Sequence, residues 1–141
     1  MGNFDLKPPD IMYVEINKEA TFTWRYTPPA GTSALINVWC KTDAITNSCP
    51  MIPIMRKRPS DPVPLVRADN TEYYSRTTGV APYTMKIRNI RLSDDGTYLM
   101  RVTFDNGNMI SDFVKLVVLG MYAVLYCQGC RGQRGQLPLL P

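Results

Sequence analysis

Four cysteines are the residues of this chain whose chemistry depends most on their spacing. Cys40 and Cys49 lie on either side of the segment KTDAITNS, and Cys127 and Cys130 form a single Cys-x-x-Cys motif near the C-terminus. The first two are a possible disulfide that would join a strand to the segment after it. Two free thiols are the alternative, because sequence does not determine the Cβ geometry that a bridge requires.

The Cys-x-x-Cys motif does not complete a metal or redox site. A structural zinc site usually needs four ligands, and the chain contains no histidine. Only the distant Cys40 and Cys49 remain to join Cys127 and Cys130. A thioredoxin-like role would require a βαβ setting, which this chain lacks. We therefore predict that the protein binds no metal and no cofactor.

The remaining side chains argue against catalysis and against nucleic-acid binding. Without histidine, the chain has no side chain of the type that most often acts as a general base near neutral pH. No nucleophile with a base, carboxylate cluster or phosphate-binding loop is evident, so an enzyme is not expected. The formal charge of +4 is spread along the chain, with one basic cluster at 56–58. Nucleic-acid-binding domains usually concentrate more positive charge.

Short β-rich segments must position these side chains. Apolar residues make up 45% of the chain and charged residues 20%, the balance of a folded domain. The segment YVEINKEATFTWRY, residues 13–26, alternates apolar and polar residues as a half-buried strand does. Residues 34–41 are partly apolar on both faces, which predicts a strand covered on both sides or contacted by a partner. The DNGN turn after Phe104 predicts a hairpin.

The chain is expected to contain three regions. Residues 1–9 are an N-terminal extension, 10–119 form one domain, and 120–141 are a C-terminal tail that is flexible or packed on a neighbour. Within the domain, the proline-rich segment 42–69 is expected to form loops and edge strands. The apolar run 116–126 is shorter than the ~20 residues that a membrane-spanning helix needs.

Three motifs carry a resemblance to a known family. The passage MKIRNIRLSDDGTYLM contains Asp94, Gly96 and Tyr98 at alternate positions, INVWCK contains Trp39, and ATFTW ends at Trp24. In this order they resemble strands E to F, C and B of the immunoglobulin superfamily, and of its variable-type (V-set) branch in particular. The resemblance implies an all-β fold, an immunoglobulin-like antiparallel β-sandwich with Greek-key connections.

The resemblance also implies roles for residues near the E to F turn. Arg76 precedes Asp94 at about the spacing at which V-set domains pair an arginine with an aspartate across the base of the sandwich. The hydroxyl of Tyr98 is expected to bond to the backbone near this corner, so that a buried ring keeps its polar end satisfied.

The chain departs from the family at the usual inter-sheet disulfide. Trp24 and Met100 stand where the two cysteines would be expected. Loss of such a bridge typically costs ~2–5 kcal/mol, and burial of a tryptophan contributes about 4–6 kcal/mol as an upper estimate. We therefore predict that Trp24, Trp39 and Met100 form one buried cluster. The alternative is that Trp24 and Met100 are large core residues without direct contact.

The function that the resemblance implies is protein recognition. The leading hypothesis is a recognition module of a cell-surface or secreted protein that acts in adhesion, in self-recognition or as an immune-type receptor. The full-length parent protein is expected to carry the membrane anchor. The partner of the module is a protein, with a second copy of this chain as one candidate. The alternative is an intracellular, cytoplasmic domain of a cytoskeletal or muscle-type scaffold, where a missing disulfide is expected.

V-set domains frequently pair through the sheet that contains strands C, F and G. If Met100 points inward, alternation predicts six outward residues on strands C and F: Ile36, Val38, Cys40, Leu99, Arg101 and Thr103. On strand G, either the set containing Asp112 or the set containing Phe113 faces outward, and the sequence leaves this register open. The prediction is a homodimer that buries the apolar centre of this face.

Overall fold

The computed structural model describes residues 3–120, and its larger sheet has six strands in the order β2-β11-β10-β5-β6-β7. These strands are β2 (Ile11–Glu15), β5 (Ala34–Lys41), β6 (Met55–Lys57), β7 (Leu65–Val66), β10 (Gly96–Phe104) and β11 (Met109–Leu119). Strand β2 runs parallel to β11, and every other pair in this sheet is antiparallel.

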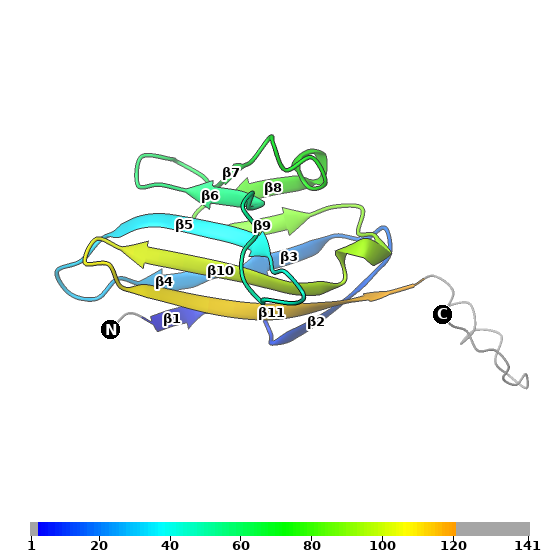
Figure 1. The fold of residues 1–141 in the computed structure, drawn as a ribbon, viewed down its shortest axis with the longest axis horizontal. Coiled ribbons are helices and arrows are strands. Elements are labelled where there is room, and N and C mark those ends of the chain that lie inside the picture. The colour runs from blue at the N-terminus through cyan, green and yellow to red at the C-terminus, as the bar shows by residue number, and fades with distance from the viewer. Residues whose placement is uncertain (1–2, 121–141) are drawn as a thin grey trace, which may run out of the picture.

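A three-stranded sheet packs behind the larger one (Figure 1). It contains β3 (Ala20–Thr23), β9 (Thr84–Ile87) and β8 (Thr77–Val80) in that order, and two 3-10 turns, η1 (Tyr74–Arg76) and η2 (Leu92–Asp94), precede β8 and β10. Strand β1 (Asn3–Leu6) pairs with β4 (Arg25–Thr27). The segment predicted to be an N-terminal extension thus contributes a strand.

The predicted hairpin joins the two longest strands, β10 and β11. Gly107 has a φ of +88°, and its N–H donates to the carbonyl of Phe104 at 2.9 Å. This is the backbone region that glycine adopts at little steric cost. The hairpin register settles which residues of β11 face inward, because Asp112, Val114 and Leu116 are buried whereas Phe113 is exposed.

The core lies between the two sheets and contains side chains from both. Its largest fully buried members include the aromatic residues Phe22, Trp24, Trp39, Tyr98 and Phe104. In β10 the inward positions are buried as a period of two requires. This arrangement is the predicted all-β sandwich.

The proline-rich segment after β5 forms the predicted loops and two short strands, of which β7 is at the edge of the larger sheet and β6 lies between β5 and β7. The chain before β7 lies close to β8, because a Cβ placed on Gly79 would overlap the carbonyl oxygen of Pro64. Among the described residues, no helix is long and apolar enough to cross a membrane. The predictions for the C-terminal tail, including Cys127 and Cys130, lie outside the described residues except at Gly120.

Candidate recognition face and the core beneath it

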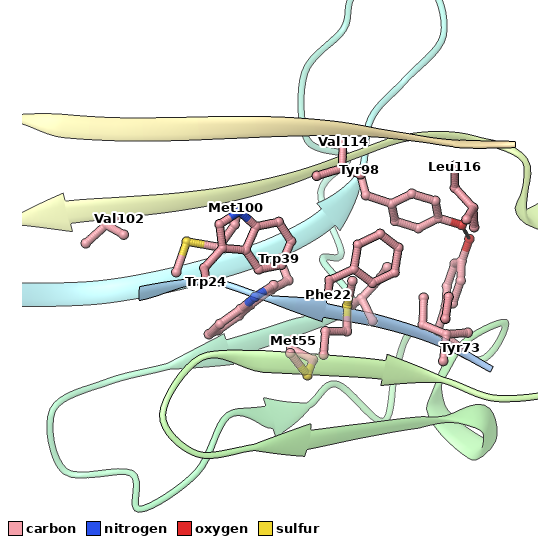
Figure 2. Packing of buried hydrophobic residues seen from close by; sticks show 14 of the residues in the cluster. Phe22, Trp24, Trp39, Met55, Tyr73, Tyr98, Met100, Val102, Val114 and Leu116 are labelled. Carbon is pink, nitrogen blue, oxygen red and sulfur yellow. Dashed lines mark hydrogen bonds between the residues drawn. The ribbon is translucent and has the colours of Figure 1, made fainter. Parts of the chain in front are cut away.

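The residues in place of the inter-sheet disulfide lie together in the core. Trp24, Trp39 and Met100 are all fully buried, and Trp39 is directly opposite Met100 across β5 and β10. Figure 2 shows the three side chains in one cluster between the sheets. The ring of Phe22 stacks on Trp24, with centroids 6.0 Å apart. Aromatic packing therefore occupies the place of the covalent link.

A buried carboxylate that the sequence analysis did not single out completes this cluster. Asp112 lies opposite Met100 on β11, and its Oδ2 accepts a hydrogen bond of 2.8 Å from Nε1–H of Trp24. The ammonium of Lys7 is 3.7 Å from the other carboxylate oxygen. A buried charge needs such partners. In the sequence, Asp112 could be placed inside only by choosing one of the two possible registers of the strand at 109–119.

The base of the sandwich holds a buried ion pair. The guanidinium of Arg76 donates to both carboxylate oxygens of Asp94, at 2.8 and 2.9 Å, and the two side chains are 4% and 0% exposed. Arg76 also donates to the backbone carbonyls of Arg88 and Asn89. Burial acts to raise the pKa of Asp94, but the hydrogen bonds from Arg76 and from the Arg91 amide hold that pKa below its usual value.

The rest of the Asp-x-Gly-x-Tyr motif builds the corner above this pair. The Tyr98 hydroxyl donates to the carbonyl of Asp94 at 2.6 Å. It also lies 3.0 Å from the Tyr73 hydroxyl, as Figure 2 shows. Burial raises the pKa of Tyr98, so the hydroxyl keeps its proton. Gly96 has a φ of +149°, and a Cβ there would lie 2.7 Å from Cε of Lys41. Glycine is favoured here because residues with a Cβ rarely adopt this φ, whereas the lysine side chain is flexible and can move.

The opposite side of the six-stranded sheet, here called the outer face, is open to solvent over its central strands. Cross-strand pairing places its side chains in rows: Arg56, Val38, Arg101 and Ser111 form one, and Ile36, Thr103 and Met109 form the next. Met109 is 58% exposed and Phe113 is 42% exposed. Four of the predicted outward residues, Ile36, Val38, Arg101 and Thr103, are half-buried on this face.

The predicted contact roles of Cys40 and Leu99 are wrong. Cys40 forms a disulfide with Cys49, with the Cα atoms 5.7 Å apart, and is itself fully buried. Leu99 lies opposite Cys40 and is 1% exposed. The disulfide holds the loop after β5 over this end of the sheet, and Figure 1 shows that loop crossing in front of β10. Both residues point outward but lie under the loop.

The loop presents apolar groups of its own. Met51 is 96% exposed, and Ile45 on the same loop is almost fully exposed. The carboxylate of Asp43 accepts hydrogen bonds from the amides of Ile45 and Thr46, at 2.7 and 3.0 Å, and so orders the turn. A groove of about 700 Å³ separates the loop from residues 69–73. Within residues 3–120, no group of three or more acidic, cysteine or histidine side chains is placed to hold a metal ion.

Comparison with known proteins finds similarity to solved structures and none at the level of sequence families. No family model matches the chain. No curated protein matches it either. The murine CRIg structure is 14% identical over 84% of this chain and 98% of its own, with a TM-score of 0.63. The first immunoglobulin-like domain of human CD48 is 16% identical over 93% of this chain and 90% of its own, with a TM-score of 0.58.

A third similar structure is Dpr1 IG1 bound to DIP-eta IG1, 18% identical over 84% of this chain and 96% of that one, with a TM-score of 0.56. At these identities the likeness describes the fold. The predicted β-sandwich, the buried Arg76–Asp94 pair and the Tyr98 corner agree with it. The chain therefore has the immunoglobulin fold, with aromatic packing where the inter-sheet disulfide was expected.

Proposed function

We propose that this chain is a protein-recognition module of a cell-surface or secreted protein, and that its outer face binds the partner. The observation that carries the proposal is the apolar surface left open on the central strands of the larger sheet. The half-buried Ile36 and Val38 of β5 face the same side as the exposed Met109 and Phe113 of β11. Strand β10 lies between them. Exposed apolar side chains gathered on one face of a folded domain commonly mark an interaction site.

The composition of the outer face supports a protein ligand. Apolar and aromatic side chains lie beside Arg56 and Arg101, and interfaces are enriched in aromatic residues, methionine and arginine. The surface lies on regular strands, so its backbone is already ordered before binding. One of the similar structures is itself a complex of two immunoglobulin domains, Dpr1 IG1 with DIP-eta IG1, which supports a protein as the class of ligand.

The disulfide supports an extracellular location. Cys40 and Cys49 are bonded, and structural disulfides persist in oxidising compartments but are rare in the cytosol. The intracellular scaffold hypothesis drew its support from the missing inter-sheet bridge. A bond elsewhere in the same domain removes that argument, so we favour the cell surface or a secreted protein.

The proposal predicts that a negative charge placed on the outer face weakens binding of the partner. The tetramerised chain is applied to a panel of purified extracellular domains from the organism that encodes it. Phe113→Glu should weaken binding to any partner by about tenfold or more, because it buries an unpaired carboxylate in the contact. Thr21→Glu, at an exposed position of β3 on the other sheet, is the matched control and should bind normally.

Thermal unfolding of both variants checks that the fold is retained. Binding lost with Thr21→Glu but kept with Phe113→Glu would move the site to the other sheet and reject the outer face.

A further inference from the structure

Two arginines at the centre of the outer face have no acidic partner. Val38 pairs with Arg101 of β10 on one side and with Arg56 of β6 on the other. With neighbouring strands about 4.8 Å apart, the two arginine backbones are about 10 Å apart on the same face. Neither guanidinium takes part in an ion pair within residues 3–120.

Nearby carboxylates do not neutralise this pair. The charge of Arg56 reaches Asp69, but that carboxylate is held first by Arg67, whose guanidinium donates to it at 2.7 and 3.0 Å. The hydrogen bonds from Arg67 are also the main reason that the pKa of Asp69 is lowered. Because the single carboxylate of Asp69 is shared by Arg67 and Arg56, it does not neutralise both, and a net positive charge remains beside Val38.

The whole sheet has the same imbalance. Its six strands contain only two acidic residues, Asp112 and Glu15, and Asp112 faces the interior. Glu15 lies at the end of the edge strand β2. Of the five basic residues of these strands, Arg56, Arg101 and Lys115 are on the outer face. Lys41 and Lys57 pair with the inward residues Tyr98 and Asn37 and lie on the other face. The outer face is therefore apolar and cationic, with no compensating anion at its centre.

We infer that the partner of the outer face is a different protein whose contact surface carries carboxylates opposite Arg56 and Arg101. This inference rests on the proposed function. Arginine binds a carboxylate through two parallel hydrogen bonds, which fixes orientation as well as charge. Val38 between the arginines would contact an apolar group between the partner's two carboxylates.

The same charges disfavour the homodimer expected from the fold. A two-fold symmetric pair brings one surface patch against itself. Pairing through the centre of the outer face would bring four arginines together, two from each copy, while removing them from water. Like charges opposed across an interface suppress association.

A charge-reversed copy of the chain is the probe for this inference. Arg56→Glu combined with Arg101→Glu gives a face with the shape of the original and carboxylates at its centre. Lys86 lies on β9 of the smaller sheet, and Lys18 lies in the turn before β3, where its carbonyl accepts from the amide of Ile90. Lys18→Glu combined with Lys86→Glu therefore makes the same change in net charge away from the outer face. Analytical ultracentrifugation then measures association of the unmodified chain alone, with the charge-reversed copy, and with the control.

We expect the unmodified chain to remain monomeric and to bind the charge-reversed copy at least about tenfold more tightly than the control copy. Added salt should weaken that complex because it screens the charges. Self-association of the unmodified chain that equals its association with the charge-reversed copy would overturn the inference. Failure of the charge-reversed copy to bind would overturn it as well.

The recognition proposal is judged separately from the partner's charge. Any extracellular domain that loses binding to Phe113→Glu is tested again with the doubly charge-reversed chain, which should also lose at least about tenfold. A partner that is lost with Phe113→Glu but retained by the charge-reversed chain would keep the outer face as the site. It would reject an acidic partner surface.

Discussion

Trp39 and Cys40 are neighbours on β5 but belong to regions that are stabilised in different ways. Trp39 points into the sandwich, where packing and buried polar contacts hold the two sheets together. Cys40 points to the outer face, where a disulfide attaches a surface loop to the sheet. The expected cross-link between sheets is missing, and the bond that exists spans one loop. The inward face of β5 is thus stabilised by packing, and its outward face carries the covalent bond.

The two regions also differ in how far apart their partners lie in the sequence. The disulfide joins residues with a separation of 9. In the interior, the hydrogen bond from Trp24 to Asp112 joins residues 88 positions apart. The contacts that hold segments far apart in the sequence together are therefore the interior ones. Breaking them should cost more free energy of unfolding than breaking the disulfide.

The largest effect is expected from removing the buried guanidinium. Arg76→Ala leaves the carboxylate of Asp94 buried without its cation, which should lower the free energy of unfolding by about 3–5 kcal/mol. Urea denaturation measures the loss. Arg67→Ala is the matched control, because it breaks the more exposed pair with Asp69 and should cost no more than about 1 kcal/mol.

The buried pair also predicts how stability depends on pH. The folded pKa of Asp94 lies below its ordinary value of about 3.9. The pair's contribution should therefore be complete above about pH 5 and be lost as pH falls below 4 through the folded pKa. Asp94→Asn should unfold with a shallower dependence on acid than the unmodified chain. Equal slopes would mean that Asp94 does not supply this stability.

Truncation of the core cluster should have the next largest effect. Met100→Ala opens a cavity beside Trp39 and should cost about 2–5 kcal/mol in urea denaturation. Met51→Ala, at an exposed loop position, is the control and should stay within about 0.5 kcal/mol. Similar costs for the two variants would show that Met100 does not take the place of the missing bridge.

The disulfide should contribute least of the three. Cys40→Ala combined with Cys49→Ala releases a short loop, for which chain entropy predicts a loss of about 2–3 kcal/mol. Limited proteolysis should then cut the loop after β5 faster, and reduction of the unmodified chain should reproduce both changes. A cost greater than that of Arg76→Ala would reverse the order proposed for the two regions.

Much of the site could be predicted from sequence because strands alternate with a period of two. That period placed Trp39 and Met100 inside and Val38 and Arg101 outside, in agreement with the structure. It also placed Leu99 outside, where the residue does point, but alternation contains no information about what covers a face. Leu99 is buried because the loop attached through Cys49 lies over it.

The sequence by itself determined the fold and the corner motif, because alternation and the Asp94 to Tyr98 spacing are local patterns that survive without the family's disulfide. Only the tertiary structure decided that Arg56 lies beside Val38 and Asp112 beside Trp24. Those contacts depend on which strands become neighbours and on their register. Both are set by the packing of segments far apart in the chain, which a short stretch of sequence does not encode.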